Sequence, residues 1–213
     1  MKPILLLGGG GHAKCVINAL RLSGVYAPAG ILDIKSRVGQ KVLGVAITGC
    51  DSDLPAYFNR GIKFCCITLG STGDPSGRIK LWALAQKAGF QFPNIIHPSA
   101  VVSKNAVLGQ GNYIGPMAVV NPGALIGDHC ILNTGSIIEH DCSIGDFAHI
   151  APGAALSGGV LVGDRAHIGT GCAVTQCVKI GADSVVGSGS VVIRDIPARV
   201  VCCGNPARKI NSK

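Results

Sequence analysis

An aliphatic side chain returns every six positions in residues 123–146, which read G-A-L-I-G-D-H-C-I-L-N-T-G-S-I-I-E-H-D-C-S-I-G-D. The same step continues in both directions without an insertion, and sixteen successive positions from Val102 to Val192 are all Ile, Leu or Val. The residue two positions earlier is Ala, Cys or Ser in thirteen of the sixteen cases, and the next residue is Gly in eight. Six residues do not return to one face of an α-helix, so the tract predicts short strands joined by bends.

Each position of the hexad therefore receives a role. The aliphatic residue fills an interior, the small residue lets neighbouring strands close up, and we expect the glycine to permit the bend. The pattern resembles the hexapeptide repeat of the left-handed parallel β-helix, and the resemblance implies three faces per coil. One coil then takes eighteen residues, so Asp128, Asp146 and Asp164 should stack on one ladder. We interpret these aspartates as turn residues that bond local backbone, not as ligands.

Residues 2–96 carry a different pattern, in which short apolar strands alternate with helices. We expect strands over 4–7, 29–32 and 63–69 and helices over 13–22, 54–59 and 79–88. The alternation predicts a small parallel sheet with helices on its faces, a Rossmann-like α/β unit. The predicted organisation is an α/β domain at 1–96, a left-handed β-helix domain at 97–195 and a C-terminal cap or tail at 196–213.

A glycine-rich loop, Gly8-Gly9-Gly10-Gly11-His12, separates the first expected strand from the first helix. Free backbone N–H groups and the helix dipole favour an anion at such a place. Gly8, Gly10 and Ala13 fit G-x-G-x-x-A, and Asp33 lies twenty residues beyond Ala13, as in the dinucleotide fingerprint. The unit is shorter than a two-half dinucleotide domain, so we expect a mononucleotide-type ligand. The alternative is that the glycines only allow a tight turn, although a turn needs no imidazole at His12.

Composition narrows the partners. The net charge is +8, but no Lys/Arg cluster is interleaved with aromatic residues, so we expect phosphate-bearing small molecules and no nucleic acid. No apolar run approaches the roughly 20 residues of a membrane helix, and the opening apolar stretch is too short for a signal peptide, so we expect a cytoplasmic protein without a membrane partner. The ten cysteines show no C-x-x-C spacing, and no metal is expected.

The α/β unit, the glycine-histidine loop, the uninterrupted repeat and the closing Gly204-Asn205-Pro206-Ala207 together resemble the sialic acid O-acetyltransferase-like family. This family includes bacterial N-acetyltransferases that act on UDP-linked 4-amino-4,6-dideoxy sugars. The resemblance covers nearly the whole chain. It implies a homotrimer with active sites between protomers, acetyl-CoA in the groove between neighbouring β-helices, and a nucleotide sugar on the N-terminal domain. The implied activity is acetyl-CoA-dependent N-acetylation of such a sugar, with UDP as the expected carrier.

The resemblance also implies roles for individual residues. His140 matches the family's general base, Asp141 its acidic partner, and Asn133 a polar residue near the reaction centre. Ile34 stands where the family often has a second acidic residue, so contacts to the base would come from its backbone alone. Acetyl-CoA contacts are implied at His149, Gly158, Gly169 and Thr170, and nucleotide-sugar contacts at Gly10, Gly11, His12, Asp33, Ile34, Leu69 and Gly70.

The triplet Glu139-His140-Asp141 interrupts a tract that is poor in charge, while the aliphatic step continues on either side. A histidine with a pKa near neutrality suits removal of a proton from an amine that attacks a thioester, and a carboxylate can fix its tautomer. Adjacent side chains on a strand point to opposite faces, so Asp141 needs a bend to reach His140, and Glu139 is the alternative. His149 or a backbone N–H would supply the donor at the developing oxyanion.

Other functions remain open at this point. One is O-acetylation of a sialic-acid-type sugar. A second is a metal-dependent hydratase that resembles the gamma carbonic anhydrases, with His140, His149 and His167 as ligands, although these lack the short spacing of that family. A third is a non-catalytic trimerisation module. Cys65, Cys142 and Cys172 could carry an acyl group, but the sequence gives none of them a clear base.

Overall fold

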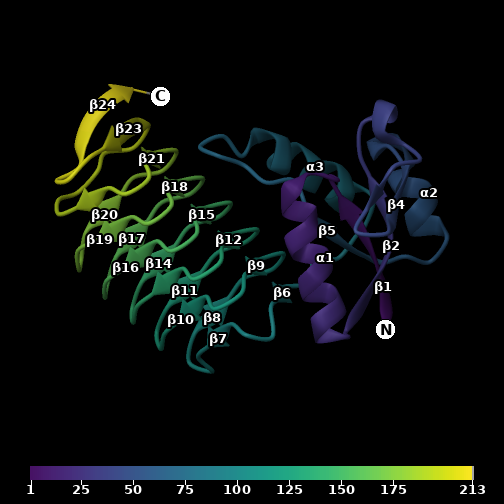
Figure 1. Ribbon diagram of the computed structural model, residues 1–213, viewed down its shortest axis with the longest axis horizontal. Coiled ribbons are helices and arrows are strands. Elements are labelled where there is room, and N and C mark those ends of the chain that lie inside the picture. The colour runs from purple at the N-terminus through teal and green to yellow at the C-terminus, as the bar shows by residue number, and fades with distance from the viewer. Residues whose placement is uncertain (213) are drawn as a thin grey trace. The chain divides into compact units, whose positions relative to one another are not determined.

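The computed structural model describes residues 1–212 of the chain. They form two compact units, one from residues 1–71 and 75–98 and one from residues 72–74 and 99 onward. Helices and longer strands alternate in the first unit, and short strands stack in the second (Figure 1). No helix within residues 1–212 is long and apolar enough to cross a membrane.

The first unit is built on a sheet with the strand order β3-β4-β2-β1-β5. Strands β4, β2, β1 and β5 run parallel, which confirms the predicted parallel sheet, and β3 forms an antiparallel hairpin with β4 that the sequence did not predict. The elements are β1 (Lys2–Leu7), α1 (Gly11–Ser23), β2 (Tyr26–Leu32), the 3-10 turn η1 (Lys35–Arg37), β3 (Lys41–Val42), β4 (Val45–Gly49), the 3-10 turn η2 (Asp51–Asp53), α2 (Leu54–Asn59), β5 (Phe64–Ile67), α3 (Ser76–Lys87) and β6 (Ile95–Ile96).

Packing of the sheet fixes the edge at which loops meet. Leu5 and Leu7 of β1 share one buried cluster with α2 and α3, and α1 packs along β2. Helix α1 ends at Gly24, whose φ of 66° is the left-handed cap that glycine favours. The carboxyl ends of parallel strands meet at one edge, and there the Gly8 N–H donates to the Leu32 carbonyl at 2.8 Å. The glycine loop therefore lies beside the end of β2.

The second unit is the left-handed β-helix that the repeat predicts. Partners in neighbouring coils are eighteen residues apart, as in Val120 opposite Ile138 and Ile144 opposite Val162. One sheet contains β7 (Val101–Val102), β10 (Val119–Val120), β13 (Ile137–Ile138), β16 (Ala155–Leu156), β19 (Ala173–Val174) and β22 (Val191–Val192); a second contains β8 (Val107–Leu108), β11 (Leu125–Ile126), β14 (Ser143–Ile144), β17 (Leu161–Val162) and β20 (Lys179–Ile180); the third contains β9 (Tyr113–Ile114), β12 (Ile131–Leu132), β15 (His149–Ile150), β18 (His167–Ile168), β21 (Val185–Val186), β23 (Val200–Cys203) and β24 (Arg208–Ser212).

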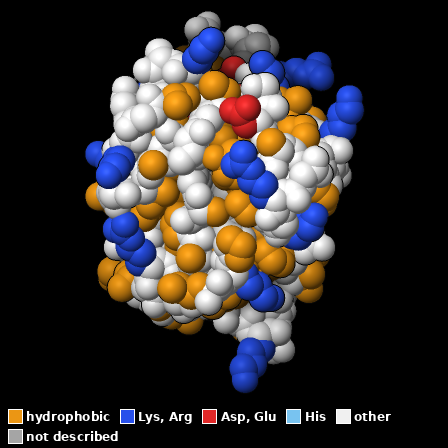
Figure 2. Space-filling model, turned by 90° about the vertical axis from the view of Figure 1, so that its right-hand side faces the viewer, with side chains coloured by type: hydrophobic (Ala, Val, Ile, Leu, Met, Phe, Trp, Pro, Cys, Tyr) orange, Lys and Arg blue, Asp and Glu red, His pale blue; other side chains and the backbone are white. Residues whose placement is uncertain are grey.

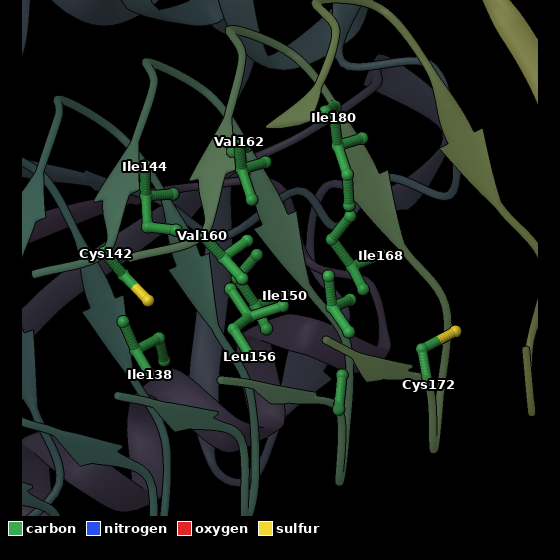
Figure 3. Close-up of a cluster of buried hydrophobic side chains, with 14 of the residues drawn as sticks. Ile138, Cys142, Ile144, Ile150, Leu156, Val160, Val162, Ile168, Cys172 and Ile180 are labelled. Carbon is green, nitrogen blue, oxygen red and sulfur yellow. The ribbon is translucent and has the colours of Figure 1, made fainter. Parts of the chain in front are cut away.

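The interior of the β-helix is one hydrophobic cluster made by the aliphatic and small positions of the hexads. Ile138, Ile150 and Ile168 point inward with Cys142 and Cys172 (Figure 3). The segment expected as a cap or tail contributes two strands, because β23 pairs parallel with β21 and β24 folds back antiparallel on β23. These pairs cover the last coil, so the third sheet continues past the end of the repeat.

The glycines that follow the aliphatic residues serve packing between coils, which corrects their expected role in the bend. A Cβ on Gly127 would lie 2.4 Å from Asp146 Oδ1, and one on Gly163 would lie 2.5 Å from Ala182 N. The left-handed bend falls two residues later, as at Gly123 and His129 with φ of 77° and 56°. All five corners after the second sheet carry this glycine, namely Gly109, Gly127, Gly145, Gly163 and Gly181.

The corner after the first sheet contains no glycine at the equivalent position. Its residues are Ser103, Asn121, Glu139, Ser157, Thr175 and Ile193. Glu139 therefore does not replace a glycine at its own corner, where every coil carries a side chain.

The stacked aspartates connect coils. The Asp128 N–H donates to Asp146 Oδ1 at 2.8 Å, and the Asp146 N–H donates to Asp164 Oδ1 at 3.0 Å. Their predicted structural role is confirmed, but each carboxylate accepts from backbone one coil away, not from its own turn.

Candidate active site

The turn after β13 brings His140 and Asp141 together. His140 Nδ1 lies 2.9 Å from Asp141 Oδ2, and both residues are exposed on the outside of the β-helix. Asp141 has a φ of 59°, and this left-handed bend brings two adjacent side chains into contact. The hydrogen bond from Asp141 raises the pKa of His140, and the charges of Asp141 and Glu139 act in the same direction. Asp141 is thus the carboxylate that holds the imidazole.

Glu139 is held by a different partner. Its Oε2 accepts a hydrogen bond from Asn121 Nδ2 at 3.0 Å, and its backbone N–H donates to the Leu156 carbonyl at 3.1 Å. Glu139 therefore adds negative charge near His140, while orientation of the ring comes from Asp141.

The imidazole of His140 rests on Gly158 of the next coil. A Cβ added to Gly158 would lie 2.6 Å from both Cε1 and Nε2 of the ring. The Gly159 N–H donates to the His140 carbonyl at 2.9 Å, which joins the two turns. Among residues 1–212 no acceptor takes the Gly158 N–H. An unused backbone donor therefore lies close to the exposed ring nitrogen.

Asn133 and His149 form a second polar group. Asn133 Nδ2 lies 3.2 Å from His149 Nε2, and Asn133 Oδ1 accepts from the Thr134 N–H at 2.9 Å. The His149 ring stacks edge-on against that of His167, with centroids 4.9 Å apart. The structure therefore joins two predicted site residues, Asn133 and His149, and no direct hydrogen bond among those described links them to His140.

The two remaining positions with implied acetyl-CoA contacts follow β18. A Cβ on Gly169 would lie 2.5 Å from the Val186 carbonyl, so packing against the next coil already requires glycine there. Thr170 is exposed, and its carbonyl accepts from the Gly189 N–H at 2.8 Å. Its side chain is available at the surface of the β-helix.

In the first unit, the glycine loop opens onto the start of α1. Gly10 is the N-cap residue and Gly11 begins the helix, and a Cβ on either would meet nothing within 4 Å. Gly8 has a φ of 104° and approaches Leu69 so closely that a Cβ would lie 3.0 Å from its backbone N. His12 Cβ lies 3.4 Å from the position that a Cβ on Gly70 would take. The structure therefore brings the predicted loop residues and the Leu69–Gly70 segment together.

Asp33 secures this loop through its own contacts. Its Oδ2 accepts from the Gly9 N–H at 2.8 Å and pairs with Arg37 Nη1 at 2.6 Å, and its Oδ1 accepts from the Ile34 N–H at 2.7 Å. Arg37 Nη2 also donates to the Gly9 carbonyl at 2.9 Å. Asp33 is therefore occupied within the chain, and so is the Ile34 backbone N–H that was expected to reach the base.

A pocket of about 210 Å³ lies at the carboxyl edge of the sheet, beside this loop. The sequence prediction missed Asp51 and Lys80, because they belong to η2 and α3 and no motif joins them to the glycine loop. The lining residues are Gly8, Leu32, Asp33, Ile34, Asp51, Leu69, Gly77, Lys80 and Leu81.

Comparison with known proteins is consistent with both units. Residues 3–81 match the PglD N-terminal domain family, and residues 123–158 match the bacterial transferase hexapeptide family of six repeats. No curated protein sequence matches the chain. PerB from Caulobacter crescentus, solved in complex with CoA and GDP-perosamine, is 41% identical over 99% of this chain and 98% of its own, with a TM-score of 0.92. Further structures of the Caulobacter crescentus protein name it a perosamine N-acetyltransferase.

This chain belongs to the hexapeptide-repeat sugar N-acetyltransferases. The acetyltransferase domain of PglB from Neisseria gonorrhoeae, solved with acetyl coenzyme A, is 32% identical over 98% of this chain and 99% of its own, with a TM-score of 0.90. WeeI from Acinetobacter baumannii is 26% identical over 99% and 100%, with a TM-score of 0.82. The predicted family and its acetyl-CoA-dependent acyltransferase chemistry are confirmed.

The cysteines of this acetyltransferase are poor nucleophiles. Burial raises the pKa of Cys65 well above its ordinary value, and burial also raises the pKa of Cys142 and Cys172. A thiol reacts as its thiolate, so these groups stay protonated and unreactive near neutral pH. Direct transfer assisted by His140 is the chemistry that the acetyltransferase is equipped for.

Replacement of Asp141 by asparagine is expected to shift the pH dependence of the acetyltransferase. Asparagine tolerates the left-handed conformation but lacks the charge that raises the pKa of His140. A base acts only when it is neutral, so wild-type kcat/KM should fall as the pH drops through the raised pKa of His140. In the Asp141→Asn variant the same fall should occur at lower pH, in a pH profile of kcat/KM. Glu139→Gln is the matched control and should shift the profile less, whereas an unmoved profile in Asp141→Asn would contradict the assignment.

Proposed function

We propose that this acetyltransferase transfers an acetyl group from acetyl-CoA to the amino group of a nucleotide-linked 4-amino-4,6-dideoxy sugar. The observation that carries the proposal is the His140–Asp141 pair, with Nδ1 held at 2.9 Å and the opposite ring nitrogen exposed above Gly158. PerB was solved with CoA and GDP-perosamine, and the PglB domain with acetyl coenzyme A, which supports both substrates.

His140 acts as the general base in this proposal. Its Nε2 accepts the proton that the amine loses on attacking the thioester carbonyl, and the Asp141 carboxylate stabilises the resulting imidazolium. The proton then passes to the departing CoA sulfur, so the products are the sugar amide and the free CoA thiol. The Gly158 N–H is the donor that we assign to the carbonyl oxygen, because it is unused within residues 1–212 and lies beside the ring.

The nucleotide sugar is assigned to the first unit. Helix α1 offers an N-terminus without acidic residues in its first turn, and this favours the diphosphate. Gly10, Gly11 and His12 would approach the phosphates and sugar, and the pocket beside Asp33 would hold the base. UDP as the carrier stays a prediction from sequence, whereas the ligand of PerB is a GDP sugar.

A homotrimer with active sites between protomers is also part of the proposal. Val101, Val107 and Leu125 are 62%, 61% and 51% exposed on the outside of the β-helix, and burial of such side chains against another copy would stabilise an oligomer. Light scattering should give three times the chain mass. Nucleic acid is not a proposed partner, since Lys and Arg side chains stand apart from one another on the face that Figure 2 shows.

The proposal is tested by incubating the protein with acetyl-CoA and nucleotide-linked 4-amino sugars. Release of free CoA thiol and gain of one acetyl group on the sugar nitrogen, identified by mass spectrometry, are expected. The same sugar already acetylated at nitrogen is the control and should release no thiol. Transfer only to hydroxyl groups of free sialic acid would favour the O-acetyltransferase alternative and contradict the proposal.

The metal-dependent hydratase has less support from the geometry. Within residues 1–212 no three His, Cys, Asp or Glu side chains gather as a metal ion would need, so His140, His149 and His167 do not converge within one chain. The His149–His167 stack is only a pair.

A further inference from the structure

The pocket of the first unit contains two carboxylates with different surroundings. Asp33 is occupied by the Gly9 N–H, the Ile34 N–H and the Arg37 guanidinium. Asp51 also lines the pocket, and among residues 1–212 no group donates a hydrogen bond to its side chain. Asp51 therefore has acceptor capacity left for a ligand, and Asp33 has little.

The local structure explains why Asp51 and not Asp53 faces this role. In η2, Asp53 Oδ2 accepts from the Cys50 N–H at 2.8 Å and closes the capping box of the turn. A Cβ on Gly49 would lie 2.4 Å from the same oxygen, so Asp53 is held against the backbone. Asp51, at the first position of the turn, is left to the pocket.

Charge in the pocket is arranged as an acceptor and a donor. Burial raises the pKa of Asp51, the Lys80 ammonium opposes this, and the Asp33 charge adds to it. Lys80 lines the same pocket, although its nitrogen is not within ion-pair distance of Asp51. Apolar walls come from Leu32, Leu69 and Leu81. A planar ring with hydrogen-bond donors at one end of its edge and an acceptor at the other would match this lining.

Nucleobases differ in this pattern. Guanine presents two adjacent donors, N1–H and the 2-amino group, next to the O6 acceptor. Uracil presents one donor between two carbonyl oxygens, so a carboxylate that faces N3–H also faces at least one oxygen with which it repels. Adenine and cytosine each place a ring-nitrogen acceptor beside their amino group. Only guanine offers a carboxylate two donors side by side and a cation one acceptor.

We propose that this pocket selects guanine, so that the substrate is a GDP-linked amino sugar and not the UDP-linked one that the sequence predicts. Asp51 accepts hydrogen bonds from N1–H and the 2-amino group, and Lys80 donates to O6. The pocket, at about 210 Å³, is smaller than the roughly 300–1,000 Å³ of sites for whole drug-sized ligands, which suits one ring system. This inference rests on the proposed function, because it assigns the base of that same substrate.

Calorimetric titration with GDP, UDP and inosine diphosphate tests the inference, with CoA as the internal control. Inosine diphosphate lacks only the 2-amino group of guanine. The wild type should bind GDP at least about tenfold more tightly than UDP or inosine diphosphate, because each lost hydrogen bond to a charged group is costly. Asp51→Asn should weaken GDP binding about tenfold and abolish most of the difference between GDP and inosine diphosphate, while CoA binding stays unchanged.

Lys80→Met is the matched variant in the same pocket. It should weaken GDP and inosine diphosphate equally, because both retain O6, and should leave the ratio between them unchanged. Equal binding of UDP and GDP, or an Asp51→Asn variant with wild-type GDP affinity, would overturn the guanine assignment. Acetyl transfer to UDP-linked amino sugars would then keep the proposed function intact. Absence of binding by every nucleotide would overturn the proposed function itself, and the guanine assignment with it.

Discussion

Replacement of His140 by alanine is expected to lower kcat by about 10²–10⁴-fold, the range that a positioned general base contributes. The exposed ring nitrogen of His140 is the proposed proton acceptor, and its other nitrogen is bound to Asp141 at 2.9 Å. The loss should be seen in steady-state release of CoA thiol at saturating substrates.

The same variant should fold normally. His140 is exposed, and the neighbouring Ile138 and Ile144 that fill the interior are unchanged. Substitutions at exposed positions shift the free energy of unfolding by roughly 0.5 kcal/mol or less, so the melting temperature and CoA binding should match the wild type. A folded variant with near-wild-type kcat would remove His140 from the mechanism.

Replacement of Gly158 by alanine is expected to lower kcat by about 10²-fold, since displacements near 1 Å in an active site have effects of this size. Gly158 is not among the residues with positive φ, so its backbone accepts alanine without strain. The new Cβ would lie 2.6 Å from Cε1 and Nε2 of His140, and the exposed ring must move away. The protein should remain folded, with kcat as the measured change.

A double-mutant cycle separates this effect from a general disturbance of the coil. If alanine at position 158 acts by displacing the imidazole, then Gly158→Ala should lower kcat no further in the His140→Ala background. An equal fractional loss in both backgrounds would show that Gly158 acts independently of the ring.

The sequence predicted the repeat because its period is carried by interior side chains, which depend only on position along the chain. The differences between corners were not predicted, because a period of six treats every bend alike. Glycine follows the aliphatic residue at every corner after the second sheet, where the coils approach closely, and never after the first. Only a period of eighteen separates these corners, and it explains why Glu139 fits without disturbing the fold.

The candidate site was predicted where one short segment carries the chemistry. Glu139-His140-Asp141 is contiguous, and the required bend is supplied by the left-handed residue that recurs in each hexad. Asp51 and Lys80 could not be found in this way, since parallel strands bring η2 and α3 to one pocket from distant parts of the chain. The hairpin of β3 and β4 was missed because its strands are short and carry no clear alternation.

The eighteen-residue register limits how the length of the β-helix can change. Insertion of one residue would turn every later aliphatic side chain out of the interior, whereas insertion of a whole coil would preserve all three ladders and lengthen the stack by about 4.8 Å. The His140–Asp141 pair is set by its own turn and by the adjacent coil that contains Gly158. Chain length in this unit is therefore free to vary in steps of one coil at either end, while the two coils that form the site remain together.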